Sequence, residues 1–389
     1  MQNTCNELLD CCLRGERWSG ELLDRALAVE DGRALLSIVV ERLGDLFEPR
    51  LVDVYEELFL EVIRKVRPDL LPRARRFKGG AVPPVFVARV YVLSRVTLGA
   101  DVAVTSVLID AAKRRYPDSE IVFVAPRKNY EMFETDPRVT HFPAPYPRSS
   151  SLRDRLEASA SLDLTRGIVI DPDSRLTQLG LLRICDDADY FFFESRGYGG
   201  EGVDRLPDLA ARWAAETFGV EGARPYVAPK GRLGREAAPL LSRFGLGTVD
   251  ITVSLGVGEN PAKRIDGTFE RDLLRMLAET GASLLVDLGG SDEERRRVLA
   301  ALPEGARTHD GAFAPFAAQI ASSKLFVGYD SAGGHVASAC GVPVISIAKG
   351  FVSERMAARW RPLGTVIRGD GGDVLGEVRK QLGEPGLVF

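Results

Sequence analysis

The sequence predicts an α/β protein in which two Rossmann-like domains face each other across a cleft, preceded by an all-helical extension. Apolar residues recur at helical spacing within residues 1–66. Strands then alternate with helices from Val85 onward, and a second alternating block begins at Val249. Because the strands of both blocks are short and nearly continuous apolar runs, they predict parallel sheets that helices cover on both faces.

These patterns divide the 389 residues into four parts. We expect the helical extension and a linker over residues 1–80, a first Rossmann-like domain over 81–222, a second over 223–370, and a C-terminal helix over 371–389. The linker "RPDLLPRARRFKGGAVPP" contains four prolines and a run of basic residues. Paired domains of this kind form a cleft at the carboxyl ends of their strands.

Composition narrows the class of protein further. A formal charge of −4 gives no reason to expect a nucleic-acid partner. No apolar run approaches the roughly 18 residues of a membrane span, and the first ten residues lack the pattern of a secretory signal. We therefore expect a cytoplasmic protein. Peripheral contact with the inner face of the membrane, through the basic linker, and homo-oligomerisation, through the amphipathic helices, stay open.

The segment "VGYDSAGGHVASACGVPVISIA" carries the first candidate site. A strand that ends at Asp330 places this carboxylate at the sheet edge, and Ser331 is a plausible N-cap for the helix that follows. Gly333 and Gly334 would let a ligand approach the backbone at the helix start, where free N–H groups favour phosphate. His335 would add a further donor. A tight strand–helix junction with glycines for packing is the alternative.

A second segment, "SLGVGENPAKR", suits the same ligand. Gly256 and Gly258 lie in a loop after a strand, and Lys263 and Arg264 follow. Such a loop can close over a diphosphate, with lysine as a point charge and arginine as a planar fork. A solvated basic pair on a loop is the alternative.

The third candidate is Asp101, which follows Gly99 at a strand-to-helix junction in the first block. A carboxylate there could accept the proton of an attacking hydroxyl. It could equally be a helix N-terminal residue that interacts with the macrodipole.

Two other motifs are weaker. "GYGGEG" matches a dinucleotide fingerprint in letters only, because no helix opens after it. Asp171 and Asp173 have the D-x-D spacing of some metal-dependent glycosyltransferases. Those enzymes have a different fold, against which the second Rossmann-like block argues, so we expect no metal. Arg175 could touch an acceptor or a phosphate.

Four segments together resemble the heptosyltransferase-like family 9 of glycosyltransferases. "DSAGGHVASACGVPVISI" is similar to the family's donor-binding segment, and "TLGADVAVTSVLIDAAKRRYPDSEIVFVAP" to its opening segment. "SLGVGENPAKR" and "LLVDLGGSDEE" resemble two further segments, and the likeness covers roughly residues 85–370 in order. Ala100 is an extra residue relative to the family's Gly-Asp pair, and Ala332 stands where the family has glycine.

The resemblance implies the GT-B fold and an inverting transfer of a sugar without a catalytic metal or other cofactor. The donor would be a nucleotide-diphosphate sugar, with ADP-heptose the leading candidate, held by the second Rossmann-like domain. The first would bind the acceptor, whether a glycan, a lipid-linked molecule, a protein or a small molecule. By resemblance, Asp101 matches the general base, Lys263 the lysine that holds the diphosphate, and Asp330 to His335 the donor-binding segment.

Two alternatives remain open at this point. A family member that binds nucleotide or glycan without transfer would act as an interaction or assembly protein through its N-terminal helices. A sugar-nucleotide epimerase would change the free donor and need no acceptor.

Overall fold

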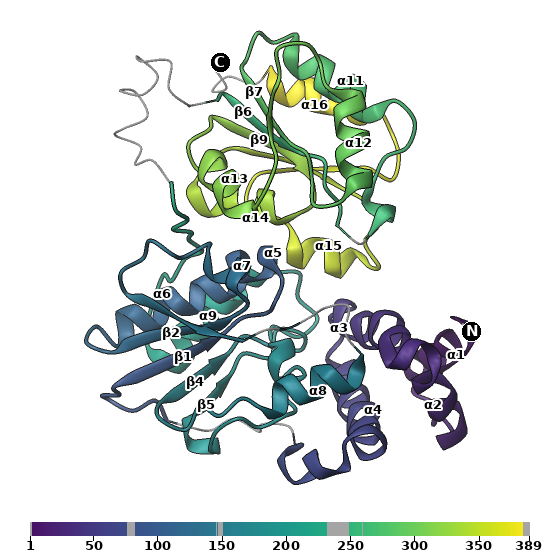
Figure 1. Ribbon diagram of the computed structural model, residues 1–389, viewed down its shortest axis with the longest axis vertical. Helices are drawn as coiled ribbons and strands as arrows, with labels where there is room; N and C mark the ends of the chain where they lie inside the picture. Colours follow the sequence, from purple (N-terminus) through teal and green to yellow (C-terminus); the bar gives the residue numbers. More distant parts are fainter. Residues whose placement is uncertain are drawn as a thin grey trace.

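The computed structural model describes residues 2–75, 82–144, 146, 151–231, 249–258 and 260–383. Two α/β domains lie one above the other, and a helical extension lies beside the first of them (Figure 1). The expected α/β architecture with a helical N-terminal extension is confirmed.

The helical extension has its own apolar core. Amphipathic helices with buried faces build it, as the spacing of apolar residues predicts. Its core continues into the first domain through Leu152 and Leu156 of α8 (Leu152–Ala160), and Tyr55 donates a hydrogen bond to the Gln178 carbonyl at 2.8 Å. The extension is therefore part of one packed body. Its elements are α1 (Gln2–Arg14), α2 (Gly20–Leu27), η1 (Val29–Gly32), η2 (Leu35–Val40), α3 (Glu41–Asp45), α4 (Pro49–Val66) and η3 (Pro68–Arg73).

The first domain holds a five-stranded parallel sheet in the order β3-β2-β1-β4-β5. The chain starts at the centre, moves outward to β3 and crosses back to β4, which is the Rossmann order with its switch point between β1 and β4. The strands are β1 (Arg89–Leu93), β2 (Glu120–Ala125), β3 (Val139–Pro143), β4 (Ile168–Asp171) and β5 (Tyr190–Phe192).

The second domain repeats this order with one more strand. Its six-stranded parallel sheet runs β11-β10-β9-β6-β7-β8, so that the switch point lies between β6 and β9. Both predicted Rossmann-like blocks are thus present. The strands are β6 (Ile251–Ser254), β7 (Leu284–Asp287), β8 (Arg307–His309), β9 (Leu325–Tyr329), β10 (Val344–Ala348) and β11 (Thr365–Arg368).

Helices cover these sheets and connect the two domains. One apolar cluster passes from the first domain into the second through η4 (Asp101–Thr105) and α14 (Ala332–Cys340), with Val104 and Val336 fully buried in it. The other helices are α5 (Leu98–Ala100), α6 (Ser106–Arg115), α7 (Arg127–Tyr130), η5 (Arg175–Thr177), η6 (Asp187–Asp189), α9 (Leu206–Phe218), η7 (Pro261–Lys263), α11 (Phe269–Ala278), α12 (Asp292–Ala301), α13 (Phe313–Ile320), α15 (Glu354–Trp360) and α16 (Val374–Leu382).

The segment η4 is a π-helix that begins directly after Ala100, the residue that the family pattern lacks. A π turn holds one residue more than an α turn, so it accommodates an insertion inside a helix. The π turn over Asp101–Thr105 therefore offers a place for the one extra residue, Ala100.

The segment boundaries differ in part from those expected from sequence. Residues beyond 222 still pack on the first domain, since the Ala228 amide donates to the Met132 carbonyl at 2.7 Å and the Tyr226 hydroxyl to Asp136 at 2.9 Å. The first strand begins only at Arg89, and Phe86 before it is 70% exposed. The helix α16 packs on α11 and β11, so it belongs to the second domain.

A buried arginine connects the two α/β domains at α15. Arg359 has no exposed surface and donates to four backbone carbonyls of the first domain, at distances of 2.9–3.3 Å. These carbonyls belong to Ser195, Tyr198, Gly200 and Gly202. The "GYGGEG" loop thus presents carbonyl oxygens to a cation, whereas a dinucleotide fingerprint presents N–H groups to phosphate.

The same arginine contacts the helical extension. Its guanidinium lies over the Phe47 ring, 5.3 Å from the ring centroid, and Phe47 packs edge-on against Trp360. Phe47 is buried and adopts a φ of 54°, a conformation that costs energy for a residue with a side chain. All three parts of the chain therefore meet around Arg359.

Within the described ranges, no helix is both long and apolar enough to cross a membrane.

We expect Arg359→Met to lower the free energy of unfolding by about 2–3 kcal/mol, because methionine fills the space but leaves four carbonyls, among them the buried Ser195 carbonyl, without their donor. Denaturant titration followed by circular dichroism measures the change. The control is Arg368→Met, which removes a partly exposed ion pair with Glu354 and should stay within about 0.5 kcal/mol of wild type. Equal stability of the two variants would contradict the role assigned to Arg359.

Candidate active site

The site lies where the carboxyl ends of both sheets face each other. In open parallel sheets, ligands bind outside these ends at the switch point of the strand order. Loops after β1 and β4 come from the first domain, and loops after β6 and β9 from the second. Two adjoining pockets occupy this region, and Glu41, Asp45 and Arg175 line both of them.

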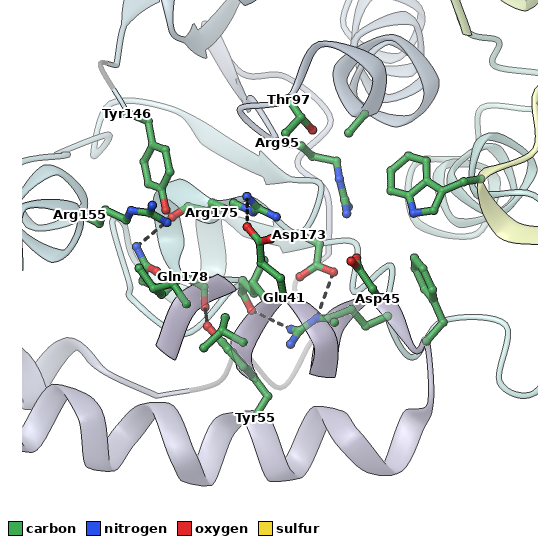
Figure 2. Close-up of a pocket in the computed structure, with 18 residues that line it drawn as sticks. Glu41, Asp45, Tyr55, Arg95, Thr97, Tyr146, Arg155, Asp173, Arg175 and Gln178 are labelled. Atoms are coloured by element: carbon green, nitrogen blue, oxygen red, sulfur yellow. Dashed lines mark hydrogen bonds and ion pairs between the residues drawn. The ribbon is translucent and has the colours of Figure 1, made fainter. Parts of the chain in front are cut away.

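The first pocket is a cavity of about 100 Å³ between the first domain and the helical extension. Arg95 follows β1, Asp173 follows β4, and Glu41, Asp45 and Tyr55 come from the extension (Figure 2). Trp360 of the second domain completes the wall, 5.7 Å from the Arg95 guanidinium.

Several charged groups line this first pocket. Arg175 pairs with Glu41 at 3.0 Å, and Arg196 pairs with Asp173 at 3.1 Å. The second carboxylate oxygen of Asp173 is buried, and the part of the chain that the structure describes offers it no hydrogen-bond partner. A buried polar atom without a partner indicates a position for a polar ligand or an ordered water.

Asp45 differs from the other acids of this pocket. Its carboxylate has no hydrogen bond or ion pair to a residue in the described ranges, and the residue is partly exposed. Burial raises its pKa to about 6, although the Arg175 cation acts in the opposite direction. Such a carboxylate can take up a proton near neutral pH.

The second pocket, of about 660 Å³, lies between the helical extension and the second domain. Gly258 and Lys263 line it, as expected for the loop after β6. The Lys263 ammonium donates to the Asp330 carboxylate at 2.7 Å and to the Asp330 carbonyl at 3.1 Å. The Ser331 hydroxyl follows directly in the chain, is buried, and has no hydrogen-bond partner among the described residues. Lys263, Asp330 and Ser331 are thus brought together.

A carboxylate holds the glycine-rich loop in place. Glu294 accepts hydrogen bonds from the amides of Val257 at 2.9 Å and Gly258 at 3.2 Å, and from the Gly290 amide at 3.0 Å. Gly256 lies beside the same carboxylate, while Gly258 has a φ of +59° and open space around it. The loop amides are therefore occupied by the protein's own anion.

The side chain of Arg264 contacts a different carboxylate from that of Lys263. It contacts Glu270 at 3.6 Å, and Arg297 and the Tyr329 hydroxyl contact the same carboxylate. Because Glu270 is buried in the second domain, this network fixes the base of the loop. Arg264 does not line the second pocket.

The first glycine of the pair in α14, Gly333, serves packing. A Cβ atom on Gly333 would lie 2.5 Å from the Phe326 ring, so glycine is required there by a neighbouring side chain. A Cβ on Gly99 would meet His335 at 3.2 Å and the Ala332 backbone at 3.4 Å, so the two domains touch at this helix start. The Phe326 ring occupies the space beside Gly333, whereas a Cβ on Gly334 would meet its nearest atom only at 3.8 Å, so an approach of a ligand to the backbone there stays a prediction.

His335 is buried between Gly99 and Trp360, with its ring centroid 6.0 Å from that of the tryptophan. Burial lowers its pKa, so the neutral imidazole is favoured. It does not line either pocket.

Asp101 is fully buried and accepts four hydrogen bonds of 2.6–2.7 Å. The donors are the Ser94 hydroxyl, the Arg95 amide, the Thr105 hydroxyl and the Asn129 side-chain amide. Burial raises the pKa of this carboxyl and the hydrogen bonds lower it. In this conformation no acceptor hydroxyl can reach Asp101. Its assignment as the general base stays a prediction, and it requires the segment after β1 to move away from the carboxylate.

The acids of the D-x-D motif have separate roles. Asp171 is buried and bound by the Ser174 amide and by the hydroxyls of Thr177 and Tyr190, whereas Asp173 reaches the first pocket. Within the described ranges, no group of three or more histidine, cysteine, aspartate or glutamate side chains could hold a metal ion.

Sequence reasoning missed the helical extension's contribution to the site. Glu41 and Asp45 occupy a short amphipathic helix, and nothing in their spacing distinguishes them from surface acids. Trp360 belongs to α15, for which Ser353 as N-cap and Glu354 in the first turn were usable signals.

No family model matches this sequence, and no curated protein matches it. Solved structures do share its fold. A family 9 glycosyltransferase of Veillonella parvula aligns with a TM-score of 0.54 and 17% identity, over 79% of this chain and 94% of that one. The E. coli heptosyltransferase WaaC with ADP-2-deoxy-2-fluoro heptose aligns with a TM-score of 0.53 and 14% identity, over 76% of this chain and 98% of that one.

This chain therefore has the GT-B fold. At these identities the likeness establishes the architecture, which has two Rossmann-like domains. The resemblance in sequence motifs and the likeness in structure point to the same group of proteins.

The two adjacent glycines of α14 provide a matched test of the packing role. Gly333→Ala should destabilise the protein by about 1–3 kcal/mol through overpacking against Phe326. Gly334→Ala meets its nearest atom only at 3.8 Å and should stay within about 1 kcal/mol of wild type, because alanine favours a helix. Denaturant titration measures the free energy of unfolding of both variants. If Gly333→Ala is as stable as wild type, Phe326 can move aside and the packing role is wrong.

Proposed function

We propose that this protein is a glycosyltransferase that moves a sugar from a nucleotide-diphosphate donor to an acceptor hydroxyl. The leading donor is ADP-heptose, the transfer inverts configuration, and no metal ion takes part. The observation that carries the proposal is Lys263, which lines the second pocket at the β6–β9 switch point and pairs there with Asp330, the residue before the buried, unpartnered hydroxyl of Ser331.

The charges of this arrangement suit a diphosphate. The Lys263 side chain is 21% exposed, so its ammonium can meet a ligand while Asp330 holds its position. The unpartnered Ser331 hydroxyl lies at the start of α14 and can donate to a phosphate oxygen. A leaving nucleoside diphosphate gains negative charge as its bond to the sugar breaks, and a fixed cation stabilises that charge most in the transition state.

The choice of ADP and heptose rests on the likeness of this chain to heptosyltransferase structures and on its motifs. The WaaC structure contains ADP-2-deoxy-2-fluoro heptose, and a further WaaC structure with ADP aligns equally well. Both share this chain's fold, and the motifs around Lys263 and Asp330 resemble the donor segments of that family.

The layout also suits a single displacement. The acceptor would occupy the first pocket and the donor the second, so that the hydroxyl reaches the anomeric carbon where the pockets adjoin. Attack on the side opposite the leaving diphosphate inverts the configuration. Fixed positions for both reactants supply much of the rate enhancement.

A second candidate function is binding without transfer. Three observations favour it: Asp101 is inaccessible, Asp330 already neutralises Lys263, and Glu294 occupies the loop amides. In this case the helical extension would act as an assembly surface.

Thermal unfolding with millimolar ADP, UDP, GDP and CDP, without metal, tests the donor site. A ligand at about 100 times its Kd adds about 2.7 kcal/mol to the stability of the folded state. We expect a selective shift with ADP that Lys263→Ala abolishes. Lys324→Ala is the control, because Lys324 pairs with Asp250 at the amino ends of β9 and β6, far from the carboxyl ends where the pocket lies, and should keep the shift.

Other outcomes have distinct meanings. A shift with a different nucleotide would keep the class of enzyme and replace ADP. A shift that persists in Lys263→Ala would move the diphosphate away from this loop, and no shift with any nucleotide would overturn the proposed function.

A further inference from the structure

We propose that Asp45, on the helical extension, is the general base that deprotonates the acceptor hydroxyl. This inference rests on the proposed function and adds a residue that lies outside both Rossmann-like domains. It makes the extension a working part of the active site.

The position of Asp45 is the first argument. Its side chain points into the pocket that Arg95 and Asp173 also line (Figure 2). Asp45 also lines the second pocket together with Lys263. A base must lie within hydrogen-bond reach of the acceptor hydroxyl while that hydroxyl faces the donor sugar, and the boundary between the two pockets meets this condition.

The second argument is that Asp45 is uncommitted. Glu41 pairs with Arg175, and one oxygen of Asp173 accepts from both Ser195 and Arg196. In the described ranges, by contrast, no donor binds the Asp45 carboxylate. An acid that already serves a cation is a weaker base, so Asp45 is the acid best able to accept a proton.

Asp45 is also held in place, as a base must be. Two residues later in the chain, Phe47 is buried between Arg359 and Trp360, and the Phe47 carbonyl accepts a hydrogen bond from Arg355 at 3.1 Å. These contacts attach the end of α3 to the second domain. The backbone that carries Asp45 is therefore anchored to the second domain, which also carries the donor loop.

The reaction step balances without a further reagent. The acceptor O–H bond breaks and its proton moves to an Asp45 oxygen, while the acceptor oxygen forms a bond to the anomeric carbon. The bond from that carbon to the diphosphate oxygen breaks, and its electron pair leaves with the nucleoside diphosphate beside Lys263. Asp45 then returns its proton to water.

The test uses the full-length protein and the slow transfer of sugar to water as its readout. The probes are ADP-heptose and ADP-glucose, and released ADP is measured. We expect Asp45→Asn to lower kcat by roughly 10²-fold or more, with KM within about twofold and the melting temperature unchanged. Asp24→Asn, which loses only an exposed ion pair with Lys65 in the same extension, should match wild type.

A pH profile gives a second readout that a structural role would not produce. Because the base must be ionised, the wild-type rate should fall as the pH drops below about 6, and Asp45→Asn should lack this limb. Asp45→Glu should recover part of the rate. The charged groups that line the two pockets around Asp45 are Glu41, Arg42, Arg95, Arg155, Asp173, Arg175, Arg196 and Lys263.

The outcomes separate this inference from the proposed function. If wild type releases ADP and Asp45→Asn does so at the same kcat, Asp45 is not the base while the transferase proposal stands. Loss of activity in Asp101→Asn at unchanged stability, with Asp45→Asn active, would assign the base to Asp101. If wild type binds ADP and releases none from either probe, both the transfer function and the role of Asp45 fail.

Discussion

The buried guanidinium of Arg359 is the contact on which the arrangement of all three parts depends. It reaches from the second domain to four carbonyls of the first, while its flat face lies over Phe47 of the helical extension. Arginine suits this position because its donors have a fixed planar geometry and its charge is never lost. Both pockets are formed by surfaces that this contact brings together.

A second constraint acts where the domains touch. Gly99 of the first domain packs closely against His335 and Ala332 of α14 in the second domain. The two domains therefore leave no space for a ligand at this contact. The space for ligands therefore lies on the other side, toward the helical extension. This explains why residues of α3, rather than Asp101, line the pockets.

Much of the fold could be predicted from sequence, because apolar runs such as those ending at Ser254 and Tyr329 are typical of buried parallel strands. Lys263 and Ser331 were predictable for the same reason, since residues after such strands share one sheet edge. The packing role of Gly333 could not be predicted, because a glycine that leaves room for a ligand and one that leaves room for a neighbouring ring look the same in sequence. Asp45 was not predictable either, since tertiary packing alone brings it to the site.

The pairing of Lys263 with Asp330 has a consequence for selectivity. Asp330 compensates the charge of Lys263, so an incoming anion must compete with a carboxylate that is only 9% exposed. A small monovalent ion gains little from such an exchange. A group with several negative oxygens can share the ammonium with Asp330, so the ion pair favours polyanionic ligands over small monovalent ions.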